Sequence, residues 1–134
     1  MRTLMLLMIF TFTTSIAFCQ TEREMDNNRV KEYKDADKKL NEVYEEILSI
    51  YKGNSVFIEN LTKAQKLWVQ FRAAQLAMKY PPQRGAGYYG SVQPMCEAIY
   101  LTKLTNQRIK ELQEWSKKSD EGEVCNGTVG EYQQ

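Results

Sequence analysis

Apolar positions recur with the period of a helix from about residue 24 onward. Between residues 24 and 51, one face returns at steps of four and three residues: Tyr33, Asp37, Leu40, Tyr44, Ile47 and Tyr51. This period is typical of an amphipathic helix and not of a strand. We therefore predict a first helix from about Glu24 to Tyr51. A turn at Gly53 follows it, and Asn54 or Ser55 is placed to cap the next helix.

The same spacing continues in the following segment. Its face consists of Phe57, Leu61, Ala64, Trp68, Phe71, Gln75 and Met78. Pro81 and Pro82 end this second helix, because proline lacks a backbone donor and disfavours a helical residue before it. Residues 83–90 then form a loop rich in glycine and tyrosine.

A third helix is indicated after this loop. Its face includes Tyr100 or Leu101, Leu104, Arg108, Leu112 and Trp115. Ser91 is placed to cap its start, and Pro94 is tolerated in its first turn. We expect the helix to end near Lys117. Residues 119–134 carry few large apolar side chains, so we expect them to form a tail held mainly by Cys125.

Three helices of about 25 residues, joined by a short turn and a longer loop, are expected to pack in alternating directions. The predicted fold class is therefore all-α, an up-down-up three-helix antiparallel bundle with a C-terminal tail. The sequence shows no strand signal and no internal repeat. The expected division is a signal peptide over residues 1–19, a helical domain over residues 20–118 and the tail over residues 119–134.

The first 19 residues differ in character from the rest, because Arg2 is their only charge and an apolar run follows it. This run is typical of an export signal and is short for a membrane span. The small residues that bound Ala17–Cys19 favour cleavage before Gln20, which predicts a periplasmic or secreted protein with no transmembrane helix in the mature chain. Lipid anchoring through Cys19 is the less favoured alternative, because Phe18 stands where a small residue is preferred. An uncleaved anchor is a third alternative.

Charge and composition exclude several function classes. The chain has 18 Lys and Arg and 17 Asp and Glu, and it loses Arg2 with the leader, so the mature net charge is zero. Nucleic-acid binding is not expected of such a chain. Because the sequence contains no histidine, histidine-dependent nucleophilic catalysis and histidine-ligated metal sites are excluded. We therefore predict no enzymatic activity, no cofactor and no metal.

The three cysteines, at positions 19, 96 and 125, lack the C-x-x-C spacing of zinc clips and redox pairs. Cleavage before Gln20 removes Cys19 and leaves Cys96 and Cys125 in an oxidising compartment, where two cysteines are usually paired. We predict an intramolecular disulfide between them. The alternative is a free or an intermolecular thiol.

Several polar residues interrupt the apolar faces or border them: Asp37, Asn41, Gln65, Arg72, Gln75, Thr105 and Arg108. An unpaired buried charge costs several kcal/mol, so Asp37 needs a cationic partner on another helix. We predict Arg108 as that partner, because the first and third helices run parallel and both residues lie at a similar height. Arg72 could join the same network. We interpret this network as structural and not as catalytic.

The spacing of these residues resembles that of one known family. The resemblance rests on Ala36-Asp37-x-x-Leu40-Asn41-x-x-Tyr44, on Leu61-x-x-Ala64-Gln65-x-x-Trp68-x-x-Phe71-Arg72, and then on Gly90-Ser91, Cys96 and Leu104-Thr105-x-x-Arg108-x-x-x-Leu112. It is similar to the LprI-like lysozyme inhibitors, small exported bacterial proteins, and covers about Met25 to Leu112. Members of that family usually carry cysteines where this chain has Asn28 and Gln75, so the resemblance does not supply a partner for Cys96.

The resemblance implies an extracytoplasmic helical protein that inhibits lysozyme. Lysozyme cuts glycosidic bonds with two carboxylates in a cleft, and a cation on a rigid loop suits such a cleft. Arg84 has this character, with Tyr88 and Tyr89 as aromatic contact surface. The alternative for these three residues is that the tyrosines fold back on the helix ends and Arg84 is only solvated. The alternative function is an envelope protein-interaction or stress-related module with no enzyme target.

Overall fold

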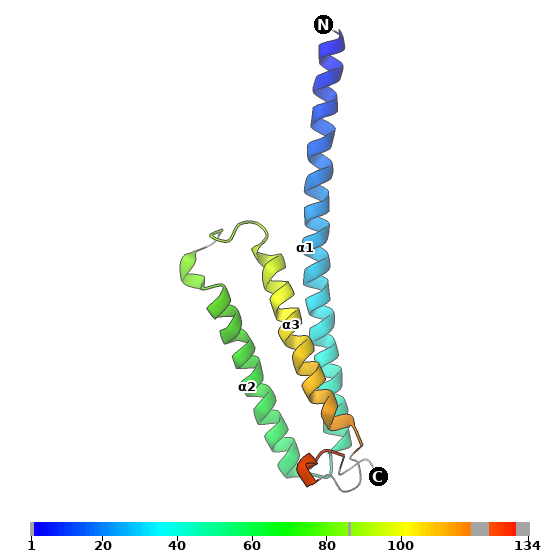
Figure 1. Ribbon diagram of the computed structural model, residues 1–134, viewed down its shortest axis with the longest axis vertical. Helices are drawn as coiled ribbons and strands as arrows, with labels where there is room; N and C mark the ends of the chain where they lie inside the picture. The colour runs from blue at the N-terminus through cyan, green and yellow to red at the C-terminus, as the bar shows by residue number, and fades with distance from the viewer. Residues whose placement is uncertain (1, 86, 119–123, 131–134) are drawn as a thin grey trace.

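The computed structural model describes residues 2–85, 87–118 and 124–130. This part of the chain is built from three α-helices, α1 (Arg2–Ile50), α2 (Ser55–Lys79) and α3 (Gln93–Gln113). They run down, up and down beside one another, with the α2–α3 loop at one end and the α1–α2 turn at the other (Figure 1). The predicted all-α, up-down-up antiparallel bundle is confirmed.

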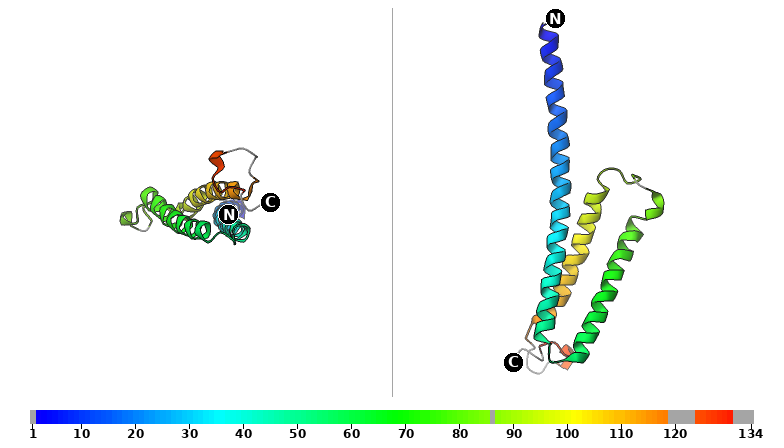
Figure 2. Two further views of the ribbon diagram at one scale, coloured as in Figure 1. Left: turned by 90° about the horizontal axis from the view of Figure 1, so that it is seen from below. Right: turned by 180° about the vertical axis from the view of Figure 1, so that it is seen from behind.

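Helix α1 is much longer than the sequence pattern suggested, with 49 residues from Arg2 to Ile50. Its predicted start at Glu24 is wrong, because the chain has neither glycine nor proline before Gly53 and nothing interrupts the backbone hydrogen bonds. The N-terminal part of α1 extends beyond the other two helices (Figure 2). Only the remainder of α1 packs in the bundle.

The core lies mainly between α1 and α3. Its buried members are Leu40, Val43, Ile47, Tyr51, Leu61, Ile109 and Leu112. Each such side chain contributes roughly 1.5–3 kcal/mol when it leaves water. Helix α2 supplies only Leu61 to this buried set within the described residues, and it packs less closely than the other two helices. Among the residues whose exposure the structure describes, α2 carries five exposed large apolar side chains: Val56, Leu67, Val69, Phe71 and Met78.

The ends of α2 and α3 follow local sequence signals. Asn54 caps α2, and its side-chain oxygen accepts a hydrogen bond from the Phe57 backbone N–H at 3.0 Å, as predicted. Pro94 lies in the first turn of α3, also as predicted. The predicted cap at Ser91 is wrong, since Val92 occupies the cap position and no side chain bonds to the helix start.

The segment after α3 is fixed by a tyrosine. A short 3₁₀ turn, η2 (Glu114–Ser116), continues α3, and η3 (Val124–Asn126) lies at the same end of the bundle (Figure 1). The Tyr51 hydroxyl lies 3.1 Å from the Trp115 carbonyl oxygen and 3.0 Å from that of Thr128, and it accepts from the Gly130 N–H at 3.1 Å. The tail thus depends on Tyr51 and not on a disulfide.

The predicted disulfide is not formed. Both Cys96 and Cys125 are free thiols in the structure. Cys96 lies in the first turn of α3, at the loop end of the bundle, whereas Cys125 lies in η3 at the opposite end. The contacts of Thr128 and Gly130 with Tyr51 hold the tail there, so the extended return along the bundle that the disulfide required does not occur.

Candidate functional site

The loop between α2 and α3 is built from consecutive tight turns. Pro82–Arg84 forms the 3₁₀ turn η1, in which the N–H groups of Arg84 and Gly85 donate to the carbonyls of Pro81 and Pro82 at 3.1 and 3.2 Å. Gly85 has φ of +83°, which side chains disfavour and glycine adopts freely. Further i to i+3 bonds continue to residue 93. The loop is therefore held by its own backbone.

Arg84 and the two tyrosines predicted as contact residues lie together on this loop. The Arg84 guanidinium donates to the Tyr88 hydroxyl at 3.3 Å, and its carbon lies 5.0 Å from the Tyr88 ring centre. Tyr88 is 59% exposed, and Arg84 is exposed as well. Tyr89 packs edge-on against Tyr88 and against Tyr80 at the end of α2, with ring centres 4.9 and 5.4 Å apart. Tyr89 thus folds back on the helix end, while Tyr88 and Arg84 face solvent as a pair.

A second cation borders this aromatic cluster. The Lys79 ammonium lies 4.2 Å from the ring centre of Tyr100 on α3 and 5.6 Å from that of Tyr80. Burial raises the pKa of the Tyr80 hydroxyl, and the nearby Cys96 and Glu97 raise it further. The loop end of the bundle presents two cations on an aromatic surface.

The polar network is centred on Arg72 and not on Arg108, which corrects the predicted pairing. Arg72 donates to the Asp37 carboxylate at 2.6 Å and to the Thr105 hydroxyl at 3.0 Å, and so joins all three helices. Its guanidinium also covers the Trp68 ring at 4.8 Å. Arg72 is 13% exposed and Asp37 38% exposed. The side chain of the predicted Asn41 is exposed and makes no hydrogen bond with another described residue.

Arg108 belongs to a separate group. Its Nε donates to the Gln65 side-chain oxygen at 3.1 Å, and its Nη1 lies 3.2 Å from Glu111 in the next turn of α3. Gln75, another polar residue on the predicted apolar face of α2, accepts a hydrogen bond from the Tyr100 hydroxyl at 3.1 Å. Arg108 and Gln75 thus each form a hydrogen bond with a neighbouring helix, as a structural role requires.

A cavity that the sequence did not indicate lies between the first half of α2 and the end of α3. Its volume is about 400 Å³, a size found among ligand pockets. Its lining comes from the two helices and the tail: Asn54, Val56, Phe57, Asn60, Leu61, Ala64, Arg108, Leu112, Trp115 and Thr128. Most of the wall is apolar, and Arg108 supplies the one charge in this lining.

Comparison with known families identifies the chain. Residues 18–112 match the model of the family described as lysozyme inhibitor LprI. This chain belongs to the LprI family. No curated protein and no solved structure matches it. The match confirms the family resemblance that the sequence motifs indicated.

The LprI match covers some of the features above and not others. The loop with Arg84, Tyr88 and Tyr89 lies inside the matched range, as does the Asp37–Arg72 pair. Trp115 and Thr128, which line the cavity, lie outside the matched range. Within the described residues of this LprI protein, no helix has the combination of length and apolar character needed to cross a membrane.

Proposed function

We propose that the protein is exported and inhibits a lysozyme without being an enzyme itself. The family match over residues 18–112 is the observation that supports this most strongly. We further propose that the leader is cleaved before Gln20, giving a periplasmic or secreted protein that begins at Gln20. The helical domain and the tail then form the mature chain.

We place the inhibitory contact at Arg84 and Tyr88. Lysozyme works with two carboxylates in a cleft, and a guanidinium gains most when it meets carboxylates away from water. Arg84 is exposed, and its described neighbours include the Tyr88 ring but no carboxylate in salt-bridge contact. It can therefore pair with a target carboxylate without breaking an ion pair of its own. Tyr88 adds a rigid apolar surface beside it.

The net charge of the hairpin formed by α2, the loop and α3 affects the rate at which the protein would associate with lysozyme. Residues 55–113 contain eight Lys and Arg against three Glu, a net charge of +5, although the mature chain is neutral. A cationic lysozyme is repelled by such a surface, so association should quicken as salt screens the charges. Recognition then depends on insertion into the acidic cleft and not on long-range attraction.

Inhibition of cell-wall lysis tests this proposal. The purified protein, added to c-type lysozyme, should slow the clearing of a cell-wall suspension in a dose-dependent way. Arg84→Ala should weaken inhibition about tenfold or more, by the loss of one charge-assisted contact. Lys34→Ala removes an exposed cation from α1 and serves as the matched control. Its inhibition should equal that of the parent, and both variants should keep the parent melting temperature.

The lysis assay has two outcomes that count against the proposal. Absence of inhibition at any dose would remove lysozyme as the target and favour an envelope-interaction module. Inhibition that survives Arg84→Ala would retain the target but move the contact surface away from the loop.

A further inference from the structure

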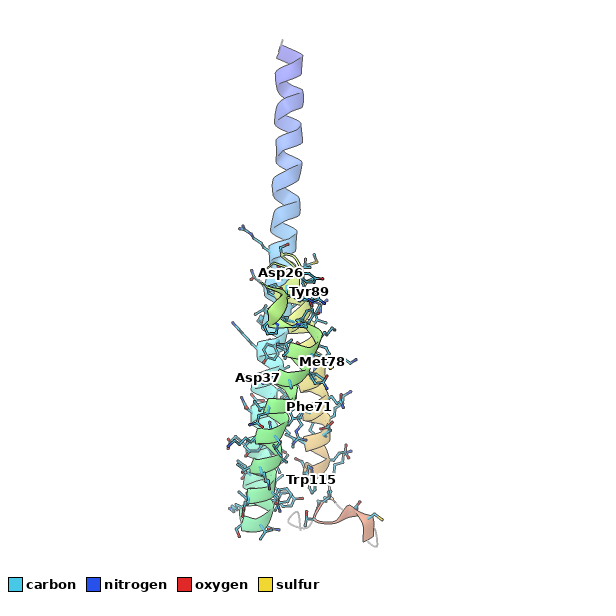
Figure 3. The ribbon with its side chains drawn as sticks, turned by 90° about the vertical axis from the view of Figure 1, so that its left-hand side faces the viewer. Asp26, Asp37, Phe71, Met78, Tyr89 and Trp115 are labelled. Atoms are coloured by element: carbon cyan, nitrogen blue, oxygen red, sulfur yellow. The ribbon has the colours of Figure 1, made fainter. Side chains whose placement is uncertain are left out.

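Helix α2 carries a stripe of exposed apolar side chains. Val56, Leu67, Phe71 and Met78 are 67%, 56%, 52% and 70% exposed. The steps of 11, 4 and 7 residues between them return to one face of a helix. Figure 3 shows Phe71 and Met78 on α2 along its edge beside α3, with Asp37 on the other side of the helix. The stripe is therefore distinct from the face that carries Arg72 to Asp37.

This stripe and the cavity form one continuous surface. Val56, Asn60 and Ala64 line the cavity, and they follow one another at four-residue steps. Leu67 and Phe71 continue this row by three and four residues. Apart from Asn60, this row is apolar, and it runs over about six turns of α2, or roughly 33 Å from Val56 to Met78. We call it the α2 groove, defined by Val56, Asn60, Ala64, Leu67, Phe71 and Met78.

The charges around the α2 groove are mostly positive. Lys63 lies four residues before Leu67 on the same face, whereas Lys66 and Glu59 lie about a quarter turn round α2 from Leu67. Neither lysine forms an ion pair with another described residue, and both are exposed. Glu111 pairs with Arg108, which lines the cavity. Lys63, Lys66 and Arg108 thus stand against Glu59 and Glu111 near the row, a net charge of +1.

We propose that the α2 groove binds an acidic amphipathic helix of a partner protein. A helix fits because the exposed row is long and narrow and repeats at helical spacing, the pattern of helix-in-groove recognition. Acidic flanks fit because Lys63 borders the row without an ion-pair partner among the described residues, and Arg108 lines the cavity at one end of the row. The inference goes beyond lysozyme inhibition, since it uses a face of α2 and not the Arg84 loop.

Two other occupants agree less well with these observations. A small amphiphile would fill the cavity of about 400 Å³ but would leave Leu67, Phe71 and Met78 uncovered. A second copy packed with its α2 against this α2 would bring the Lys63 side chains of both copies together, and like charges oppose such a pairing. A separate acidic helix covers the whole row and neutralises the lysines.

Binding of two designed peptides tests the inference. Both are 22-residue helices with leucines at heptad positions a, d and e, one with glutamates on its remaining positions and the other with lysines. Fluorescence anisotropy with the full-length processed protein should show binding of the glutamate peptide and at least about tenfold weaker binding of the lysine peptide. Leu67→Asp and Phe71→Asp should each weaken the glutamate peptide about tenfold or more.

Val69→Asp is the matched control. Val69 is an exposed apolar residue of α2, 45% exposed, and lies two residues from both Leu67 and Phe71, on the opposite side of the helix. It should change peptide affinity less than about twofold, and circular dichroism should show all three variants folded, since exposed substitutions have small effects.

Four results would overturn the inference. The glutamate peptide fails to bind, or both peptides bind equally well. Val69→Asp weakens binding of the glutamate peptide as much as Leu67→Asp does. Finally, Leu67→Asp abolishes binding of a different occupant, either a membrane or a second copy of the chain. The last is recognised in two ways. Vesicles of phosphatidylglycerol and phosphatidylcholine would bind the parent but not Leu67→Asp, or sedimentation would show a dimer that this variant dissociates.

Discussion

A double-mutant cycle on Asp37 and Arg72 tests how the three helices are joined. Asp37→Asn removes the charge while keeping the shape, and Arg72→Met keeps an apolar stem against Trp68. The pair lies at 2.6 Å, with Asp37 38% and Arg72 13% exposed, so it falls between exposed and buried ion pairs. Exposed pairs contribute about 0.2–1 kcal/mol, and breaking buried pairs costs about 3–5 kcal/mol. We expect a coupling free energy of about 1–2 kcal/mol.

Urea unfolding at neutral pH and low salt measures this coupling, provided that the slope of the unfolding free energy against urea stays constant across the variants. A second cycle on Asp37 and Arg108 is the matched control, because the structure places Arg108 against Gln65 and Glu111. Its coupling should stay within about 0.5 kcal/mol of zero. A larger coupling of Asp37 to Arg108 than to Arg72 would refute the arrangement of charges described above.

Two further predictions concern the tail and the thiols. Tyr51→Phe should lower the free energy of unfolding by about 1–3 kcal/mol, because buried partners of the hydroxyl lose their hydrogen bonds, and amide exchange should quicken at Gly130; unchanged exchange there would contradict the tail contact. Cys125, which is exposed, should be alkylated faster than the half-buried Cys96 without denaturant. A non-reduced peptide linking the two cysteines would contradict the structure.

The helices could be predicted from the sequence, but how closely each helix packs against the others could not. Steps of three and four residues identify which face of a helix is buried, and Asn54 and Pro81 mark the limits of α2. The pattern says little about how closely a buried face packs. For this reason Phe71 and Met78 lie on the predicted apolar face of α2 and yet are more than half exposed.

The error over Asp37 comes from the choice of reference point. The expectation counted residues from a start of the first helix at Glu24, but α1 has no boundary there. The shared reference is the end where α1 stops, α2 begins and α3 stops. From it, Asp37, Arg72 and Arg108 lie about 20, 26 and 8 Å along their helices, at 1.5 Å per residue. Only Arg72 is near the height of Asp37.

The candidate site was partly predictable for a related reason. Glycines and prolines of residues 81–90 indicated an exposed, ordered loop, and Arg84 and Tyr88 do face solvent. The position of Tyr89 against Tyr80 depends on packing between the helix end and the loop. The cavity depends on how α2 packs beside α3 and on Thr128 of the tail, which periodicity does not encode.

The most direct test of the central claim is whether the protein competes for the cleft of lysozyme. The protein is titrated calorimetrically into c-type lysozyme, first alone and then with the cleft saturated by a trimer of N-acetylglucosamine. Our account predicts binding to the free enzyme and a loss of apparent affinity in proportion to occupancy of the cleft. Undiminished binding to the saturated enzyme, or no binding to the free one, would contradict it.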